Sequence, residues 1–403
     1  MGQLIGVVAT PLGRVALFDL DRSLTGQDGF TFSEPPDTAP TPPDLVAQRL
    51  FAADEHVETV HVLSNLVTVA RNGGWNDESL SVATDILSKL FVFYEVESAE
   101  ERITRLRAEY YNATITSIRA HNPDLWVIRV TPDEPIKPFK PGQYTTLGLG
   151  FWEPRADDAM ENFQDNPGQI EKMARRSYSV ASSIVDGEEN LVEAHPEDVE
   201  FYLVQVRPDE NEIPALTPRI FHKKTGDRIY MGRKFTGRYT LDGVQPTDNL
   251  VFLGTGTGEA PHNTMTAELL RTGHQGKILS VVCVRYLRDL AYTSQHATVE
   301  DRYPNYKYVA LTTREPENEG NKVYIQDLIT SGRLDDELGE PLDPANTHVF
   351  LCGNPAMIGL PKQTDDDSIQ FPEQIGVSQL LHEKGFTIDR RKQRGNVHYE
   401  EYW

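Results

Sequence analysis

Cysteine is scarce in this chain. Its 403 residues include two cysteines, Cys283 and Cys352. Two are too few for a disulfide framework or for a metal centre ligated by cysteines within one chain. The 11 histidines include no HExxH pair or other close ligand spacing, so no metal site is predicted. Residence in the cytoplasm is the simplest interpretation of this cysteine usage.

Long apolar runs and positive charge are also lacking. The apolar run at 279–284 is far shorter than the roughly 20 residues that cross a bilayer. The first nine residues of the chain carry no basic residue before their apolar stretch, which argues against a secretory signal. The 61 acidic and 39 basic residues give a net charge of −22, which disfavours binding to nucleic acid or anionic membranes.

The remaining features predict a multi-domain chain with a small α+β domain at 1–96 and a charged linker at 97–110. A chain of this length has room for two or three domains with cores of their own. Within 1–96, some segments alternate like strands and others have helical spacing. The strand-like segments are 14–20, 57–63 and 66–70, and the helical ones are 45–53 and 77–94.

Beyond residue 110 the pattern changes twice. Short β-like segments separated by Gly, Pro and Asp predict an antiparallel β-barrel over 111–246, interrupted by a charged insertion at 151–175. Apolar strands that alternate with helical stretches predict a doubly wound α/β domain over 247–403. The barrel segments are 112–118, 126–130, 143–149, 176–182, 200–206, 228–231 and 238–241; those of the α/β part are 250–254, 260–271, 278–286, 308–312, 325–330 and 348–351.

One extended segment offers a cation, an aromatic face and a hydroxyl. Alternation along a strand places Arg176 and Tyr178 on the same side. A flavin dinucleotide needs a cation for its pyrophosphate and a flat partner for its isoalloxazine ring, and Ser179 adds a hydrogen-bonding group. Taken alone, these residues also fit an exposed strand with a surface arginine and a half-buried tyrosine.

A glycine-rich turn at 254–261 joins a short buried strand to a helix. Its glycines let backbone amides approach a phosphate, and the helix N-terminus favours the anion. Glu259 stands where the G-x-G-x-x-G fingerprint has its last glycine, so the turn is of another kind. Polar groups also fall at the strand ends or in the loops after them, where open α/β sheets bind ligands. They are Arg285, Thr313, Arg314, Lys322, Tyr324 and Gln326.

Ordered motifs over 111–403 resemble the ferredoxin–NADP⁺ reductase family, in its bacterial single-polypeptide FAD type. The resemblance implies a FAD-binding barrel, an NADP(H)-binding α/β domain and FAD and NADP(H) as cofactors. The motifs are Pro141-Gly142-Gln143-Tyr144, Arg176-Ser177-Tyr178-Ser179, 201–206, Leu216-Thr217-Pro218-Arg219, Gly226-Asp227, 237–241, the GTGxxxP turn at 254–261 and Cys352-Gly353-Asn354-Pro355-Ala356-Met357.

The resemblance also implies the residues that hold FAD. Arg176 would bind the pyrophosphate, Tyr178 would stack on the isoalloxazine, and Ser179 would lie near its N5 atom. The penultimate residue, Tyr402, would cover the open face of the ring, and Trp403 would stack on the adenine. The remaining contacts implied are Leu203, Val204 and Gln205 along the flavin and Ala215, Leu216 and Thr217 at the pyrophosphate.

For the second cofactor the resemblance implies NADPH rather than NADH. Thr313, Arg314, Lys322 and Tyr324 would recognise the 2′-phosphate and the adenine, although many bacterial members carry arginine where Tyr324 stands. Cys352 would lie beside the nicotinamide, and Glu400 would be an active-site carboxylate. The predicted catalytic set is Ser179, Cys352, Glu400 and Tyr402, and the coenzyme site is completed by Gly256, Thr257, Gly258, Arg285, Gln326 and Gly353.

The activity that the resemblance implies is hydride transfer between NADPH and FAD, with one-electron exchange with a ferredoxin or flavodoxin. An NADPH-dependent flavin or quinone reductase without a protein acceptor is the alternative on the same scaffold, and an interaction module with a vestigial flavin site belongs to a different class. Residues 12–94 resemble the N-terminal domain of Nfu-type iron–sulfur scaffold proteins. The CxxC motif that binds a cluster in those proteins belongs to their other domain and is absent from this sequence, so no cluster is expected on this chain. Docking to an iron–sulfur protein and simple stabilisation are both open for this segment.

Overall fold

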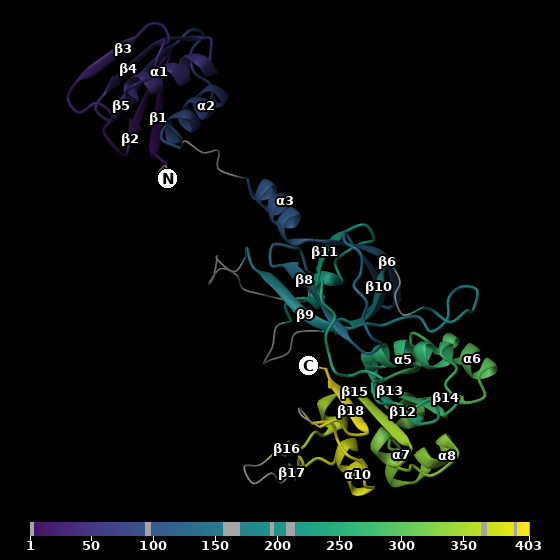
Figure 1. Ribbon diagram of the computed structural model, residues 1–403. Helices are drawn as coiled ribbons and strands as arrows, with labels where there is room; N and C mark the ends of the chain where they lie inside the picture. The colour runs from purple at the N-terminus through teal and green to yellow at the C-terminus, as the bar shows by residue number, and fades with distance from the viewer. Residues whose placement is uncertain are drawn as a thin grey trace. The chain divides into compact units, whose positions relative to one another are not determined.

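The computed structural model describes residues 4–92, 98–155, 170–193, 197–206, 214–363, 369–390 and 393–402. The chain forms two compact units, residues 1–102 and 103–403 (Figure 1). No described helix is long and apolar enough to cross a membrane. Across the same described ranges, no group of three or more His, Cys, Asp or Glu side chains could hold a metal ion.

The first unit is a five-stranded antiparallel sheet in the order β1-β2-β5-β4-β3, with two helices packed on it. Alternate strand residues such as Phe18, Val60 and Val67 face these helices because every second side chain points to the same face of a strand. Two strands were not predicted, and the second helix ends six residues before the predicted 94. The elements are β1 (Val7–Leu12), β2 (Val15–Leu20), β3 (Gly29–Phe32), α1 (Pro42–Ala53), β4 (Val57–Leu63), β5 (Leu66–Arg71) and α2 (Asp77–Ser88).

A six-stranded antiparallel sheet in the order β10-β7-β6-β11-β8-β9 opens the second unit. A bridge between Ala181 and Glu200 joins its two edges just after β9. The prediction of a strand at 238–241 is wrong: the backbone pairs with β8 at Thr236 and then bends. The helix α3 (Ala99–Tyr110) spans the boundary between the two units and precedes this sheet. The other elements are β6 (Ala113–Asn122), β7 (Leu125–Pro132), β8 (Tyr144–Gly150), β9 (Met173–Ser179), β10 (Val199–Val204), α4 (Thr217–Ile220) and β11 (Arg228–Met231).

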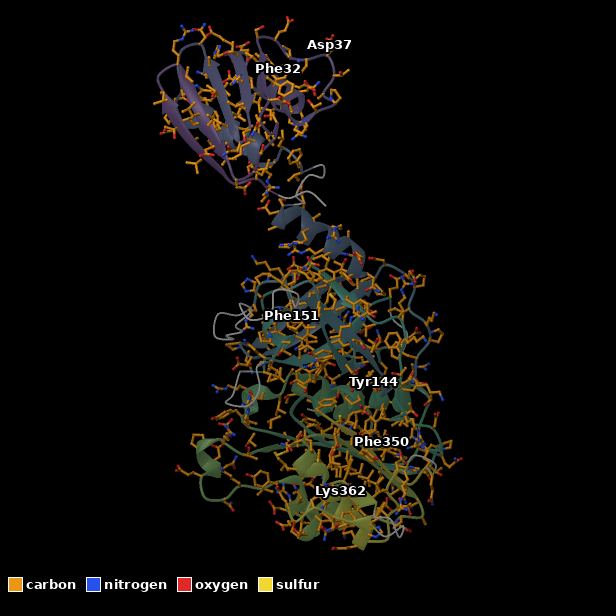
Figure 2. The ribbon with its side chains drawn as sticks, turned by 90° about the vertical axis from the view of Figure 1, so that its left-hand side faces the viewer. Phe32, Asp37, Tyr144, Phe151, Phe350 and Lys362 are labelled. Atoms are coloured by element: carbon orange, nitrogen blue, oxygen red, sulfur yellow. The ribbon has the colours of Figure 1, made fainter. Side chains whose placement is uncertain are left out.

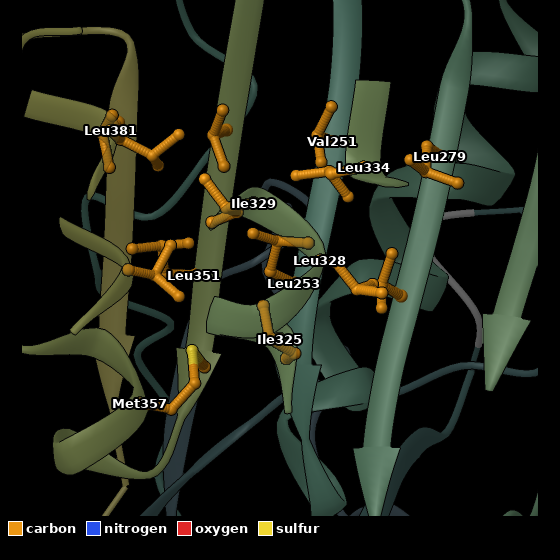
Figure 3. Packing of buried hydrophobic residues seen from close by; sticks show 14 of the residues in the cluster. Val251, Leu253, Leu279, Ile325, Leu328, Ile329, Leu334, Leu351, Met357 and Leu381 are labelled. Atoms are coloured by element: carbon orange, nitrogen blue, oxygen red, sulfur yellow. The ribbon is translucent and has the colours of Figure 1, made fainter. Parts of the chain in front are cut away.

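The rest of this unit is a parallel sheet in the order β14-β13-β12-β15-β18, with helices on both faces. Val251 and Leu253 of β12 pack toward α7 and α8 (Figure 3), whereas Phe252 faces α5 together with Phe350 of β15, labelled in Figure 2. The elements are β12 (Asn249–Thr255), α5 (Glu259–Arg271), β13 (Ile278–Val284), α6 (Thr293–Arg302), β14 (Tyr306–Thr312), α7 (Ile325–Thr330), α8 (Arg333–Leu338), β15 (Thr347–Gly353), α9 (Pro355–Ile358), β16 (Lys362–Gln363), β17 (Ile369–Gln370), α10 (Val377–Glu383) and β18 (Val397–Glu401). The sequence analysis did not predict α6, α8, α9, α10, β16, β17 or β18.

Candidate functional site: a cavity at the switch point of the parallel sheet

The site begins where the strand order of the parallel sheet reverses. The chain proceeds from β12 to β13 and β14 on one side and then returns to β15 and β18 on the other, and ligands of open α/β sheets bind at such a point. Gly258 packs so closely here that a Cβ would lie 2.2 Å from the Cys352 carbonyl oxygen. Gly353 has φ +125, and a Cβ there would lie 2.2 Å from Thr255 Oγ1. Both positions therefore require glycine.

A cavity of about 750 Å³ lies at this edge of the sheet. Its lining brings together many of the residues predicted for the coenzyme site. They are Gly256, Thr257, Arg285, Thr313, Tyr324, Gln326, Gly353 and Tyr402. The turn Asn122–Leu125 between β6 and β7, together with Val204 of β10, also lines it. The cavity is therefore shared by the parallel sheet and the antiparallel sheet.

The C-terminal strand brings the predicted catalytic residues together. β18 pairs with β15, and the Tyr402 amide donates to the Gly353 carbonyl at 2.9 Å. Burial raises the pKa of the Tyr402 hydroxyl, which lies close to the Ser179 hydroxyl and the Cys352 thiol, both of which also affect that pKa. Ser179 and Cys352 are both buried, and burial raises the pKa of the Cys352 thiol, which is therefore a neutral group at physiological pH. Tyr402 thus lies between the hydroxyl of one sheet and the thiol of the other.

Glu400 carries an unusual carboxyl group two residues earlier in the chain. Burial raises its pKa to about 7, because a low-dielectric environment disfavours the charged form. Its strand partner in β15 is Cys352. A carboxyl group with this pKa exchanges a proton near neutrality, as an active-site acid or base requires.

The predicted flavin contacts lie at β9 and β10 of the antiparallel sheet and in the segment that leads into α4. Arg176 is exposed, and its Nη1 atom donates to the Arg175 carbonyl at 3.0 Å. Tyr178 is half-buried against the barrel core, where burial raises the pKa of its hydroxyl. Leu203, Leu216 and Ala215 pack in that same core, Val204 and Gln205 are half-buried, and Thr217 is buried and accepts from the Val206 amide at 3.2 Å.

Some predicted residues are not in the cavity wall. Arg314 and Lys322 are exposed and do not line the cavity. Trp403 lies outside the described residues. Several groups that line it were not among the predicted site residues, Arg288 and Asn122 among them. The repeated arginine in Arg285-x-x-Arg288, at the end of the predicted strand 278–286, was the available signal for Arg288. No local pattern indicated Asn122.

Comparison with known proteins identifies the relatives of this chain. Residues 252–362 match the family model described as Oxidoreductase NAD-binding domain. A flavodoxin/ferredoxin–NADP reductase from Buchnera aphidicola is 25% identical over 295 residues, which cover 73% of this chain and 99% of the relative. The flavodoxin/ferredoxin–NADP reductase of Escherichia coli is 28% identical over 254 residues, covering 62% of this chain and 88% of the relative.

A solved structure shares the fold. It is a ferredoxin NADP⁺ reductase from Neisseria gonorrhoeae with bound FAD and NADP, and it superimposes with a TM-score of 0.53 at 20% identity. The match covers 72% of this chain and 98% of that one. Over the part that these matches cover, the chain is similar to ferredoxin–NADP reductases, and residues 252–362 match the NAD-binding domain of oxidoreductases.

Proposed function

We propose that this chain is a ferredoxin- or flavodoxin-linked NADP⁺ oxidoreductase that carries FAD. The observation that supports this most directly is that Ser179 and Cys352 lie close to Tyr402, which lines a cavity together with the glycine-rich turn and Arg285. Its relatives by sequence are named as reductases of ferredoxin or flavodoxin. FAD would supply the hydride and one-electron chemistry that amino-acid side chains lack.

The residues present fit both cofactors chemically. Arg176 offers an exposed guanidinium on the strand that ends at Ser179, and a guanidinium suits a pyrophosphate. The turn Gly256–Gly258 leads into α5 and lines the cavity with Gly256 and Thr257, where amides and the helix dipole favour a phosphate. We assign the flavin to the side of Ser179 and Tyr178, and the nicotinamide to the side of Cys352.

Within this assignment, the chain's own side chains orient the two cofactors, exclude water from between them and exchange protons. Ser179 and Cys352 define the two faces between which the reacting rings would stack. Tyr402 lies between them, so its ring must move aside before the nicotinamide can enter, and this movement gates turnover. Glu400, whose pKa is about 7 and whose strand partner is Cys352, is the group that would exchange a proton near the nicotinamide.

Reduction of cytochrome c by NADPH tests the proposed function. The purified protein is expected to show flavin absorption and to reduce cytochrome c faster when a ferredoxin or a flavodoxin is added. Flavin absorption with NADPH-dependent reduction of free flavin or quinone, but no response to either carrier, would instead support the reductase without a protein acceptor. A purified protein without bound flavin would refute both candidate activities, with and without a protein acceptor.

The N-terminal unit is assigned a supporting role in the same activity. Its five-stranded sheet and two helices enclose a core of their own. Because the sequence of this unit resembles the N-terminal domain of Nfu-type scaffolds, an iron–sulfur protein is the partner we assign to it. Co-purification of a cluster-loaded carrier with the full chain, and its loss when residues 1–97 are removed, would test this assignment.

A further inference from the structure

Two arginines follow β13 and line the cavity. Arg285 and Arg288 are the cationic side chains among the described residues of its lining. Both are exposed, and the Arg288 guanidinium lies 4.5 Å from the centre of the Tyr286 ring. Such stacking holds the planar group in place while leaving its N–H donors available. An anion that enters the cavity would therefore meet a pair of arginines.

The segment that carries Arg288 is fixed by the antiparallel sheet. Asn122, at the end of β6, donates through Nδ2 to the Arg288 carbonyl at 3.1 Å and to Asp289 Oδ1 at 3.3 Å. The Tyr202 hydroxyl donates to the Asp289 carbonyl at 2.9 Å. Arg119 Nη1 donates to the Ala291 carbonyl at 3.1 Å. Three side chains of the antiparallel sheet therefore hold the loop that follows β13 of the parallel sheet. The position of Arg288 thus depends on both sheets.

The carboxylate within this segment is already engaged. Asp289 Oδ1 accepts from Asn122, and its Oδ2 accepts from the Tyr286 amide at 3.2 Å. The Arg285 Nε atom lies 3.8 Å from the same Oδ2. Asp289 therefore stabilises the loop itself. Among the ion pairs of the described residues, none joins Arg288 to a carboxylate, so its guanidinium is the cationic group that this loop offers to an anion.

The location of the pair indicates which phosphate it would meet. The glycine-rich turn at the N-terminus of α5 suits a pyrophosphate, whereas the arginines lie one strand further out. There the Thr313 amide donates to the Val284 carbonyl at 3.1 Å, which brings the ends of β13 and β14 together. Tyr324 lines the cavity as well, with an exposed ring that an adenine could stack on. A phosphate on the adenosine half of the coenzyme would lie beside the arginines.

We propose that Arg288 is a specificity-determining residue that binds the 2′-phosphate of NADP(H) together with Arg285, and that Asn122 positions it from the antiparallel sheet. This inference rests on the proposed function for the identity of the coenzyme. It names two groups that the sequence motifs do not include. It also makes discrimination between NADPH and NADH depend on a contact between the two sheets.

Calorimetric titration with 2′,5′-ADP and with 5′-ADP tests the proposal without turnover. Arg288→Ala is expected to weaken 2′,5′-ADP about tenfold, as loss of a charge-assisted contact would, and to change 5′-ADP binding less than about twofold. Arg288→Lys is expected to restore part of the loss, because it keeps the charge but not the planar fork. Equal weakening of both nucleotides, or no weakening of 2′,5′-ADP, would overturn the assignment.

Asn122→Ala tests the positioning role, and Arg333→Ala is the matched control. Asn122→Ala keeps both arginines but removes two hydrogen bonds to their loop, so 2′,5′-ADP should bind several-fold more weakly while the flavin content stays unchanged. Arg333 is exposed, pairs with Glu337 on α8 and is absent from the cavity wall, so its loss should affect neither nucleotide. An Asn122→Ala protein with unchanged affinity for 2′,5′-ADP would refute the positioning role. A wild-type protein without NADPH-linked activity would reject the proposed function, whereas the titrations would still decide the role of Arg288.

Discussion

At the scale of single residues, burial decides what each group can do. Glu259 shows which features of a buried residue can be predicted from the sequence and which cannot. It stands where a dinucleotide fingerprint has glycine, and that substitution was visible in the sequence. Its carboxylate is 1% exposed and lies 2.7 Å from His296 Nε2 and 3.1 Å from the Tyr308 hydroxyl. These partners stand 37 and 49 residues further along the chain, so no local pattern could have predicted this buried pair.

Glu400 gives the first prediction at this scale. Its pKa is about 7 in the folded chain against 4.5 in a free side chain. The unfolded state therefore loses the proton first, and the folded state binds more protons between these two values. By linkage, stability falls as pH rises through this window, by about 3 kcal/mol. Glu400→Gln removes the ionisation, so its melting temperature relative to wild type should be higher at pH 8 than at pH 5. A difference that is the same at both pH values would show that Glu400 ionises normally.

At the scale of elements, the sequence predicted most strands with internal periodicity and missed those defined by pairing. Val57–Leu63 and Leu66–Arg71 form the predicted hairpin, with Ser64 at φ 56 in the turn. β18 was not predicted because its central residues are polar and lie near the end of the chain. It forms a strand by pairing with β15, which lies more than 40 residues earlier in the chain. The Tyr402 contacts follow from that pairing, which local sequence does not encode.

A buried charge network fixes α3 to the antiparallel sheet. Arg107 donates to both carboxylate oxygens of Glu153 at 2.8 Å, and Lys223 and the Tyr111 hydroxyl bond the same carboxylate. Burial alone would raise the pKa of Glu153, but the hydrogen bonds from Arg107 and Lys223 outweigh it and lower the pKa to about 2. The stability that this carboxylate contributes is therefore present above pH 4.5 and is lost as pH falls from 4.5 toward 2.

Glu153→Gln should destabilise the second unit by about 3–5 kcal/mol, because it leaves the buried Lys223 ammonium without a counter-charge. Arg107→Ala is the matched control. Its side chain is 45% exposed, and its removal leaves Lys223 paired with Glu153, so the loss should be much smaller. Urea unfolding of both variants measures the difference. Equal losses would show that Lys223 does not depend on Glu153.

The C-terminal strand gives the second prediction at this scale. Removing Tyr402 and Trp403 frees the space between Ser179 and Cys352, so the nicotinamide should stack without displacing an aromatic ring. Stacking of an aromatic pair contributes roughly 0.5–1.5 kcal/mol beyond burial. Because this free energy no longer has to be overcome, the dissociation constant of NADP⁺ should fall by the factor to which it corresponds. A stronger long-wavelength charge-transfer band with NADP⁺ and weaker discrimination against NADH are the expected readouts. Unchanged coenzyme preference and flavin affinity would exclude the terminal aromatics from the site.

At the scale of the whole molecule, the chain consists of two units with separate cores. The residues assigned to catalysis and to cofactor binding all belong to 103–403. The α3 helix begins at Ala99 with its own cap, since Ser98 Oγ accepts from the Glu101 amide at 3.1 Å and Glu101 Oε2 accepts from the Ser98 amide at 2.8 Å. A chain that starts at Ser98 therefore keeps both the capped helix and the Glu153 network.

We expect this shortened chain, residues 98–403, to retain full flavin content and an unchanged rate of ferricyanide reduction by NADPH. No residue of the cavity and no member of the Ser179, Cys352 and Tyr402 group comes from the removed segment. Ferricyanide needs no docking surface, so its reduction reports hydride transfer alone, whereas cytochrome c reduction through an added ferredoxin reports carrier docking as well. A fall in the ferredoxin-linked rate, with the ferricyanide rate intact, would support a docking role for the first unit. Loss of flavin or of ferricyanide reduction on deletion would contradict the independence of the second unit.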